Sequence, residues 1–189
     1  MSASPDLPPV VERAFAVSRR AGYVSFCRNE TGRLLAMLAA TRDGTMAEFG
    51  TGCGVGTAWL RSGVRGEKAQ IVTAELDPKL ARAATEIFDD DPLVEVLAAN
   101  WSTLMDKGPF SLLFLDSGQP GEVGVDAVAD LVEDGGIVVL DDFTPCESWP
   151  PIAYGRVDVL REQWLTDERF TTVEVMVAPD ASTLIATKR

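Results

Sequence analysis

The chain has 189 residues, a length that fits a single domain (1–189), and its 46% of hydrophobic and 24% of charged residues are ordinary for a globular protein. A formal net charge of −12 makes nucleic acid a poor candidate partner, and the absence of histidine excludes Ser-His-Asp catalysis, Cys-His catalysis and histidine-ligated metal sites. The three cysteines lack CxxC spacing, and neither a signal peptide nor an apolar run that could span a membrane is recognisable, so we expect a reduced, cytoplasmic protein without a membrane partner.

Helices and strands alternate along most of the chain. Apolar spacing predicts two helices at about 10–20 and 30–40, so that residues 1–42 form an N-terminal helical segment. Strands are predicted next, at 45–50, 70–76, 93–99, 110–116 and 135–142. The helices that separate or follow them are predicted at 55–63, 77–88, 123–132 and 154–165. Two last strands, 170–179 and 182–188, are joined by a short turn and should pair antiparallel. This order predicts an α/β fold: a doubly wound, mostly parallel sheet with a C-terminal antiparallel hairpin.

A glycine-rich turn, "AEFGTGCGVGTAWL", follows the first predicted strand. Its four alternating glycines let a backbone approach a ligand closely, at the N-terminus of the next helix. The nicotinamide fingerprint G-x-G-x-x-G fails in every register, because its third position falls on Val55, Thr57 or Trp59. With Glu48 the turn reads E-x-G-x-G-x-G, which resembles motif I of the class I S-adenosylmethionine-dependent methyltransferases. A glycine-rich turn without a ligand is the alternative.

Two further strand ends fit the same ligand. Glu75 can accept hydrogen bonds from both ribose hydroxyls, as in any doubly wound nucleotide-binding sheet. Asn100 can bond the adenine amino group and Trp101 can cover the purine face, although a helix-capping Asn beside a core Trp is the alternative. The predicted donor-binding residues are Glu48, Gly50, Gly52, Gly54, Gly56, Thr57, Glu75, Leu76, Asn100, Trp101 and Asp116.

Carboxylates end the fourth and fifth predicted strands. Asp116 follows "FSLLFL", and Asp141 and Asp142 follow "GGIVVL". Adjacent parallel strands bring such residues to one edge of the sheet, where three carboxylates are unfavourable unless a cation offsets their charge. Oxygen ligands suit Mg²⁺, Mn²⁺ or Ca²⁺. Solvated strand ends are the alternative.

These two strand ends resemble those of the metal-dependent O-methyltransferases that act on catechols and caffeoyl-coenzyme A. The resemblance runs from about Glu30 to the C-terminus. It implies a Rossmann-like seven-stranded sheet, S-adenosylmethionine as methyl donor and often a homodimer. It also implies Asp116, Asp141 and Asp142 as metal ligands, with Asp142 where the family usually has Asn. Gln119 stands where the family has its lysine base, and its amide group cannot accept the hydroxyl proton.

The sequence therefore favours an S-adenosylmethionine-dependent O-methyltransferase for a small, phenolic or catechol-like acceptor, assisted by a divalent metal, with Asp116 as the candidate catalytic residue. The acceptor pocket is expected between the N-terminal helices, the loop 117–123 and the segment that carries Phe143 and Trp149. A transfer-RNA-modifying methyltransferase and a donor-binding protein with little activity are the alternatives.

Overall fold

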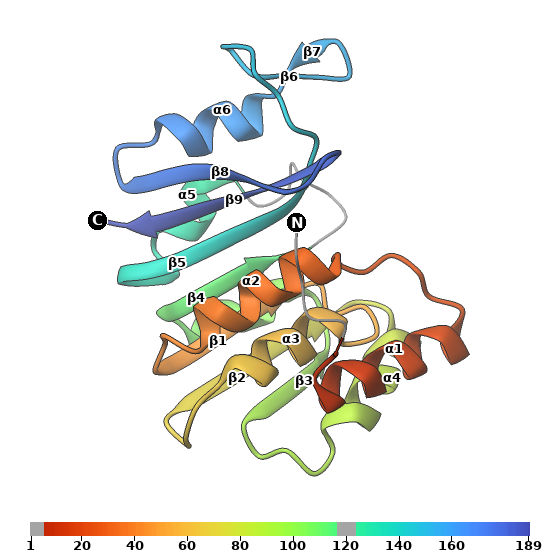
Figure 1. The fold of residues 1–189 in the computed structure, drawn as a ribbon. Coiled ribbons are helices and arrows are strands. Elements are labelled where there is room, and N and C mark those ends of the chain that lie inside the picture. Colours follow the sequence, from red (N-terminus) through yellow and green to blue (C-terminus); the bar gives the residue numbers. More distant parts are fainter. Residues whose placement is uncertain (1–5, 117–123) are drawn as a thin grey trace.

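A seven-stranded sheet forms the centre of the computed structural model, which describes residues 6–116 and 124–189 (Figure 1). The strands lie in the order β3-β2-β1-β4-β5-β9-β8. The first five are parallel, whereas β9 is antiparallel to both of its neighbours. The strands of this sheet are β1 (Gly44–Phe49), β2 (Ala69–Glu75), β3 (Val94–Ala98), β4 (Phe110–Leu115), β5 (Val132–Phe143), β8 (Phe170–Ala178) and β9 (Ala181–Lys188). The predicted α/β class, the mostly parallel sheet and the C-terminal antiparallel hairpin are confirmed.

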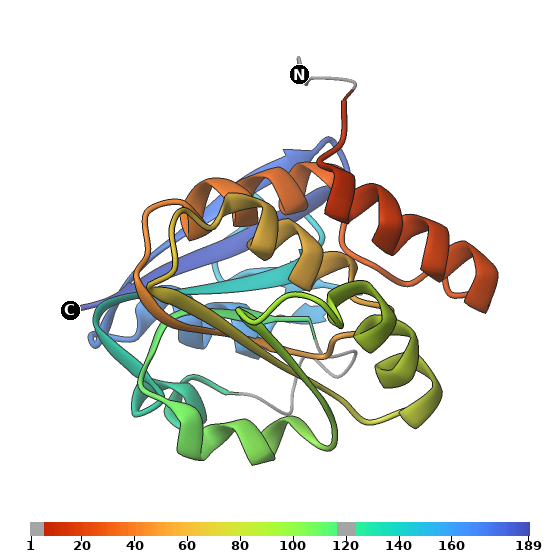
Figure 2. The same cartoon turned by 90° about the horizontal axis from the view of Figure 1, so that it is seen from below.

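Helices cover both faces of the sheet, as Figure 2 shows from a second side. One face carries α1 (Pro9–Ala21), α2 (Asn29–Ala39), α3 (Val55–Gly63) and α4 (Pro78–Phe88). The other face carries the 3₁₀ helix η1 (Trp101–Lys107), α5 (Val125–Ala129) and α6 (Val159–Thr166).

Two hydrophobic cores result from the alternation of side chains along each strand. Met46 packs with α1 to α4, whereas its neighbour Ala47 packs with η1, α5 and α6. Leu112 and Leu113 of β4 divide between the two cores in the same way. Because the inner strands are apolar on both faces, they are buried between two helical layers, as expected for a parallel sheet. This arrangement aligns the carboxyl ends of β1, β2, β4 and β5 along one edge.

Two predicted helices are wrong in their extent. The helix expected over 123–132 is limited to α5, because the chain from Val132 onward pairs with Phe110 as the start of β5. The helix expected over 154–165 begins only at Val159. Residues 154–157 instead form the turn and the second strand of a hairpin, in which β6 (Ile152–Ala153) pairs with β7 (Arg156–Val157).

Local chemistry explains the second difference. Tyr154 and Gly155 both have positive φ angles, 51° and 75°, and so form the turn of the hairpin. Asp158 then caps α6, since its carboxylate accepts a hydrogen bond from the backbone N–H of Arg161 at 3.1 Å.

Among the described residues, no helix combines the length and the apolar character needed to cross a membrane. The cytoplasmic location stays a prediction.

Candidate active site

The glycine-rich turn forms a tight loop between β1 and α3. Gly52 and Gly54 have φ angles of 52° and 84°, in the left-handed region that favours glycine. The backbone N–H of Gly52 donates a hydrogen bond of 2.8 Å to Oε2 of Glu75 at the end of β2. The structure therefore brings the glycine-rich loop and Glu75 together, and the sequence predicts both as parts of one donor-binding site.

Glu48 lies behind this loop and is completely buried. Its Oε2 accepts hydrogen bonds from the hydroxyl groups of Thr57, at the start of α3, and of Thr73 in β2. Its Oε1 has no hydrogen-bond partner among the described residues and faces Gly56. Burial raises the pKa of Glu48 to about 8. In this conformation Glu48 supports the loop from within the protein, and direct contact with a donor stays a prediction.

The end of β2 presents one polar and one apolar side chain. Glu75 is partly exposed, and its Oε1 accepts a second hydrogen bond, of 2.8 Å, from the backbone N–H of Asp77. Two hydrogen bonds from its own chain fix the carboxylate, yet each oxygen keeps a lone pair for a further donor. Leu76 beside it is 72% exposed, and its contact with a donor stays a prediction.

After the end of β3, Asn100 and Trp101 have the structural roles that were the alternatives to adenine binding. Asn100 caps η1, since its Oδ1 accepts a hydrogen bond of 2.9 Å from the backbone N–H of Ser102. Trp101 stacks on Phe49, with ring centroids 5.0 Å apart. Asn100 remains exposed and Trp101 only partly buried, so contacts of both with an adenine stay predictions.

The carboxylates at the ends of β4 and β5 influence one another. Burial raises the pKa of Asp116 well above its usual range, and the nearby charges of Glu48, Asp141 and Asp142 add to this effect. Burial, followed by the charge of Asp142, also raises the pKa of Asp141, whose Oδ1 accepts hydrogen bonds from Thr31 of α2 (3.1 Å) and Thr183 of β9 (3.2 Å).

This cluster has the chemistry of a hard-metal site without its assembled geometry. Within residues 6–116 and 124–189, no three Asp, Glu, Cys or His side chains are grouped so that they could hold a metal ion. The predicted set of Asp116, Asp141 and Asp142 is therefore electrostatically coupled but not gathered around one point. Asp142 is exposed and has a φ angle of 67°, a conformation that Asn and Asp tolerate better than other non-glycine residues.

Tyr23, in the connection between α1 and α2, belongs to the site, although no motif or spacing predicts it. A Cβ atom on Gly52 would lie 2.7 Å from the ring of Tyr23, so the tyrosine packs directly on the glycine loop. Burial and the charges of Asp116 and Glu75 raise the pKa of its hydroxyl to about 12. Tyr23 therefore stays neutral and can donate a hydrogen bond to an anionic group.

Several other predictions concern residues that the structure places differently or does not describe. Phe143 is buried beneath the guanidinium group of Arg161, at 5.1 Å from its ring centroid, whereas Trp149 is 63% exposed. Two predictions fall outside the described residues: Gln119, which replaces the lysine base of the family, and the loop 117–123, which was expected to form part of the pocket wall.

Comparison with known proteins points to one family. The model of a methyltransferase domain matches residues 47–143, just over half of the chain and the part that holds the glycine loop and all three aspartates. A protein of Mycobacterium sp. (strain KMS) that is named as an O-methyltransferase is 32% identical over 149 residues, which cover 73% of this chain and 66% of that protein. A protein of Mycobacterium tuberculosis (strain H37Rv) with the same kind of name is 30% identical over 120 residues, 58% of this chain and 52% of that protein. The chain thus spans about half the length of several curated relatives that it matches.

Solved structures share the whole fold. The O-methyltransferase TomG of Streptomyces achromogenes, solved in complex with S-adenosylmethionine, has a TM-score of 0.76 at 19% identity and covers 97% of this chain and 92% of its own. An O-methyltransferase of Bacillus cereus, solved with S-adenosylhomocysteine, has a TM-score of 0.73 at 18% identity, with coverages of 97% and 93%. The chain therefore belongs to the methyltransferase domain family and has the Rossmann-like fold of the class I S-adenosylmethionine-dependent methyltransferases.

Proposed function

We propose that this protein is an S-adenosylmethionine-dependent O-methyltransferase that acts on a small phenolic or catechol-like acceptor, with residues 1–189 working as one domain. The observation that carries the proposal is the hydrogen bond between Gly52 and Glu75. It joins the glycine loop to a carboxylate that suits ribose hydroxyls, at the same edge of the sheet as Asp116 and Asp141, which are both half-buried. Support also comes from the two solved structures of similar fold, which contain S-adenosylmethionine or its product.

The reaction requires little covalent chemistry from the protein. A lone pair of the acceptor oxygen forms a bond to the donor methyl carbon, the carbon–sulfur bond breaks, and its electron pair stays on sulfur as S-adenosylhomocysteine forms. The protein must align the oxygen with the methyl group and accept the hydroxyl proton. Asp116 suits the second task, because its raised pKa makes its carboxylate a better proton acceptor than an ordinary aspartate.

The donor site is tested by changing Glu75. In Glu75→Ala, the loss of charge-assisted hydrogen bonds, each contributing about 1.5–3 kcal/mol at most, should weaken donor binding at least tenfold. Glu75→Gln is the matched control, since its amide oxygen can still accept the hydrogen bond from Gly52. Calorimetry with S-adenosylmethionine measures the affinities, and release of S-adenosylhomocysteine with a panel of catechols measures turnover. Unchanged affinity in Glu75→Ala would contradict the donor site, while donor binding without turnover on any catechol would favour a binding protein.

We further propose that Asp116, Asp141 and Asp142 would hold a divalent cation. The support is chemical: the three groups supply only oxygen ligands, and the charges of Asp141 and Asp142 add to the effects of burial and of Glu48 in raising the pKa of Asp116. When bound, such an ion would favour the ionised form of an acceptor hydroxyl and would replace Asp116 as the means of activating it.

A melting experiment separates these two roles of Asp116. If the cation binds the folded state, saturating Mg²⁺, Mn²⁺ or Ca²⁺ should raise the melting temperature, and Asp141→Asn should abolish the increase. An unmoved melting curve with all three ions, together with turnover in the presence of a chelator, would leave Asp116 as the proton acceptor and refute the metal site.

A further inference from the structure

A cavity of about 340 Å³ lies beside the reaction edge, between the end of β5, the β6–β7 hairpin and the start of α6. A cavity of about 150 Å³ already accommodates benzene, so this one has room for an aromatic ring with a short side chain. Asp141 and Asp142 form one part of its lining. Asp141 and Asp142 belong both to this lining and to the group of carboxylates that acts electrostatically on Asp116, so the cavity and the site described above share these two residues.

Another part of the lining is apolar. It includes Tyr154 and Val157 of the hairpin and Val159 at the start of α6. These side chains are 99%, 43% and 56% exposed. Exposed large apolar side chains gathered over one short hairpin are unusual for a protein surface and are typical of a place where a ligand is covered.

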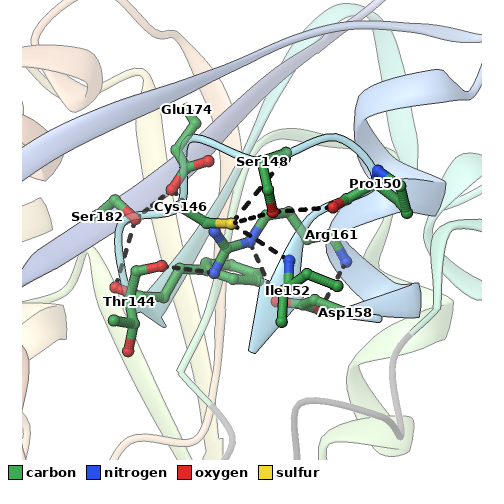
Figure 3. A network of polar contacts seen from close by, with 10 residues as sticks. Thr144, Cys146, Ser148, Pro150, Ile152, Asp158, Arg161, Glu174 and Ser182 are labelled. Atoms are coloured by element: carbon green, nitrogen blue, oxygen red, sulfur yellow. Dashed lines mark hydrogen bonds and ion pairs between the residues drawn. The ribbon is translucent and has the colours of Figure 1, made fainter. Parts of the chain in front are cut away.

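The only cationic side chain among the described lining residues is Arg161, and its charge is already used within the protein (Figure 3). Its guanidinium group, 1% exposed, bonds to Asp158 (3.1 Å), Glu174 (3.3 Å) and the carbonyl oxygen of Thr144 (2.7 Å). Within the part of the chain that the structure describes, no ion pair joins Asp141 or Asp142 to a cationic side chain. The cavity therefore combines an apolar wall with an excess of negative charge.

We propose that this cavity binds the part of the acceptor that lies away from its reacting hydroxyl, and that it selects aromatic acceptors with a neutral or cationic side chain over those with an anionic one. The inference rests on the proposed O-methyltransferase function and specifies its substrate class. A carboxylate or phosphate on the acceptor would lose its hydration water and would be repelled by the like charges of Asp141 and Asp142. An ammonium group would be attracted to the same two carboxylates.

Three catechols that differ only in the charge of a short side chain test the proposal at pH 7: an ethylamine (cation), an ethyl group (neutral) and an acetate (anion). We expect kcat/KM and affinity to fall in that order. A partly exposed charge pair changes affinity by roughly two- to fivefold, so the cation and the anion should differ on the order of tenfold at low salt. The difference should shrink as ionic strength rises.

The variant Val157→Lys tests whether acceptors are distinguished by charge in this cavity. Val157→Gln is the matched uncharged control. The lysine should improve the anionic catechol and weaken the cationic one relative to the glutamine variant, while donor binding stays unchanged in both. Equal effects of the two variants on all three catechols would overturn the assignment of this cavity.

Calorimetry on protein loaded with S-adenosylhomocysteine keeps this test independent of turnover. If the catechols bind in the expected order of charge but none is methylated, the proposed reaction fails and the cavity assignment stands. If the anionic catechol binds as tightly as the cationic one, or if none of the three binds, the proposal of an acidic acceptor cavity is wrong.

Discussion

Among the single residues, Glu48 combines complete burial with an unpartnered carboxyl oxygen beneath the glycine loop. A carboxylic acid with a raised pKa is protonated in the folded protein over a pH range in which it is ionised in the unfolded chain. Unfolding then releases a proton, so that raising the pH favours unfolding. The stability that Glu48 contributes is fully present below pH 4.5, declines as the pH rises and is lost once the pH passes about 8.

The variant Glu48→Gln, which cannot ionise, tests this dependence. We expect its free energy of unfolding to gain on that of the unmodified protein as the pH rises from about 5 to 8, and the gap to stay constant above pH 8. Denaturant titrations of both proteins at several pH values measure the gap. Because the charge of Glu48 also raises the pKa of Asp116, the gap includes the accompanying change at Asp116. Parallel pH profiles would show that Glu48 is ionised in the folded state.

Single residues also mark the limits of sequence interpretation. The place of Glu75 beside the glycine loop was predictable, because the ends of neighbouring parallel strands meet at one edge of a doubly wound sheet. Tyr23, Thr31 and Thr183 were not, because they reach the site from segments that only the tertiary fold brings there. No local spacing relates them to the glycine loop or to Asp141.

At the scale of the elements, α2 and α3 approach each other unusually closely. Gly32 of α2 lies against the indole ring of Trp59, and a Cβ atom at Gly63 would overlap the carbonyl oxygen of Ala36. The positively charged Arg33 lies over the same indole, 5.3 Å from its ring centroid. Because α2 carries Thr31, which bonds Asp141, and α3 starts at the glycine loop, this contact fixes the distance between the two halves of the site.

Replacing Gly63 with Ala tests the importance of the contact. The backbone of Ala36 cannot move aside as a side chain could, so we expect a loss of about 3 kcal/mol and a melting temperature lower by roughly 6–12 °C. Gly124→Ala is the control, since a Cβ atom there meets no described atom within 4 Å. A variant at Gly63 as stable as the one at Gly124 would mean that the helices separate at little cost.

The two predicted helices that proved wrong show where periodicity loses its power. Leu131 and Val132 fit the end of a helix as well as the start of a strand, and pairing with β4 decided for the strand. In the segment 154–158, the turn at Gly155 and the cap at Asp158 were both visible in the sequence. The apolar spacing across this segment continues into the true helix, and a prediction from spacing alone therefore begins the helix too early.

For the whole molecule, the net charge of −12 bears on the choice between a small-molecule and a transfer-RNA acceptor. Binding of a polyanion releases counterions only when the protein neutralises phosphates with its own cations. We expect no saturable binding of labelled transfer RNA in anisotropy measurements at about 50 mM salt. A basic RNA-binding protein serves as the positive control. Binding that weakens steeply with added salt would instead support the RNA-modifying alternative.

The class of the fold, a mostly parallel α/β sheet, was predictable, because alternating strands and helices connect by right-handed crossovers. The proposed acceptor cavity could not be predicted from the sequence, because it depends on the β6–β7 hairpin. Its charge also depends on Arg161, which bonds to Asp158, Glu174 and the carbonyl oxygen of Thr144. The homodimer implied by the family resemblance stays a prediction.

The hydroxyl groups around Glu48 hold the glycine loop in a fixed shape, and this bears on the rate at which the methyl donor binds. Thr51 of the loop bonds Thr73 of β2 at 2.5 Å, Thr73 bonds Glu48 of β1 at 3.0 Å, and Glu48 bonds Thr57 of α3. These buried bonds tie the loop to three elements without any ligand, so its shape exists before the donor arrives. Capture of the donor then involves no ordering of the loop backbone, and the speed of encounter is left to diffusion and to the exposed groups around the cleft.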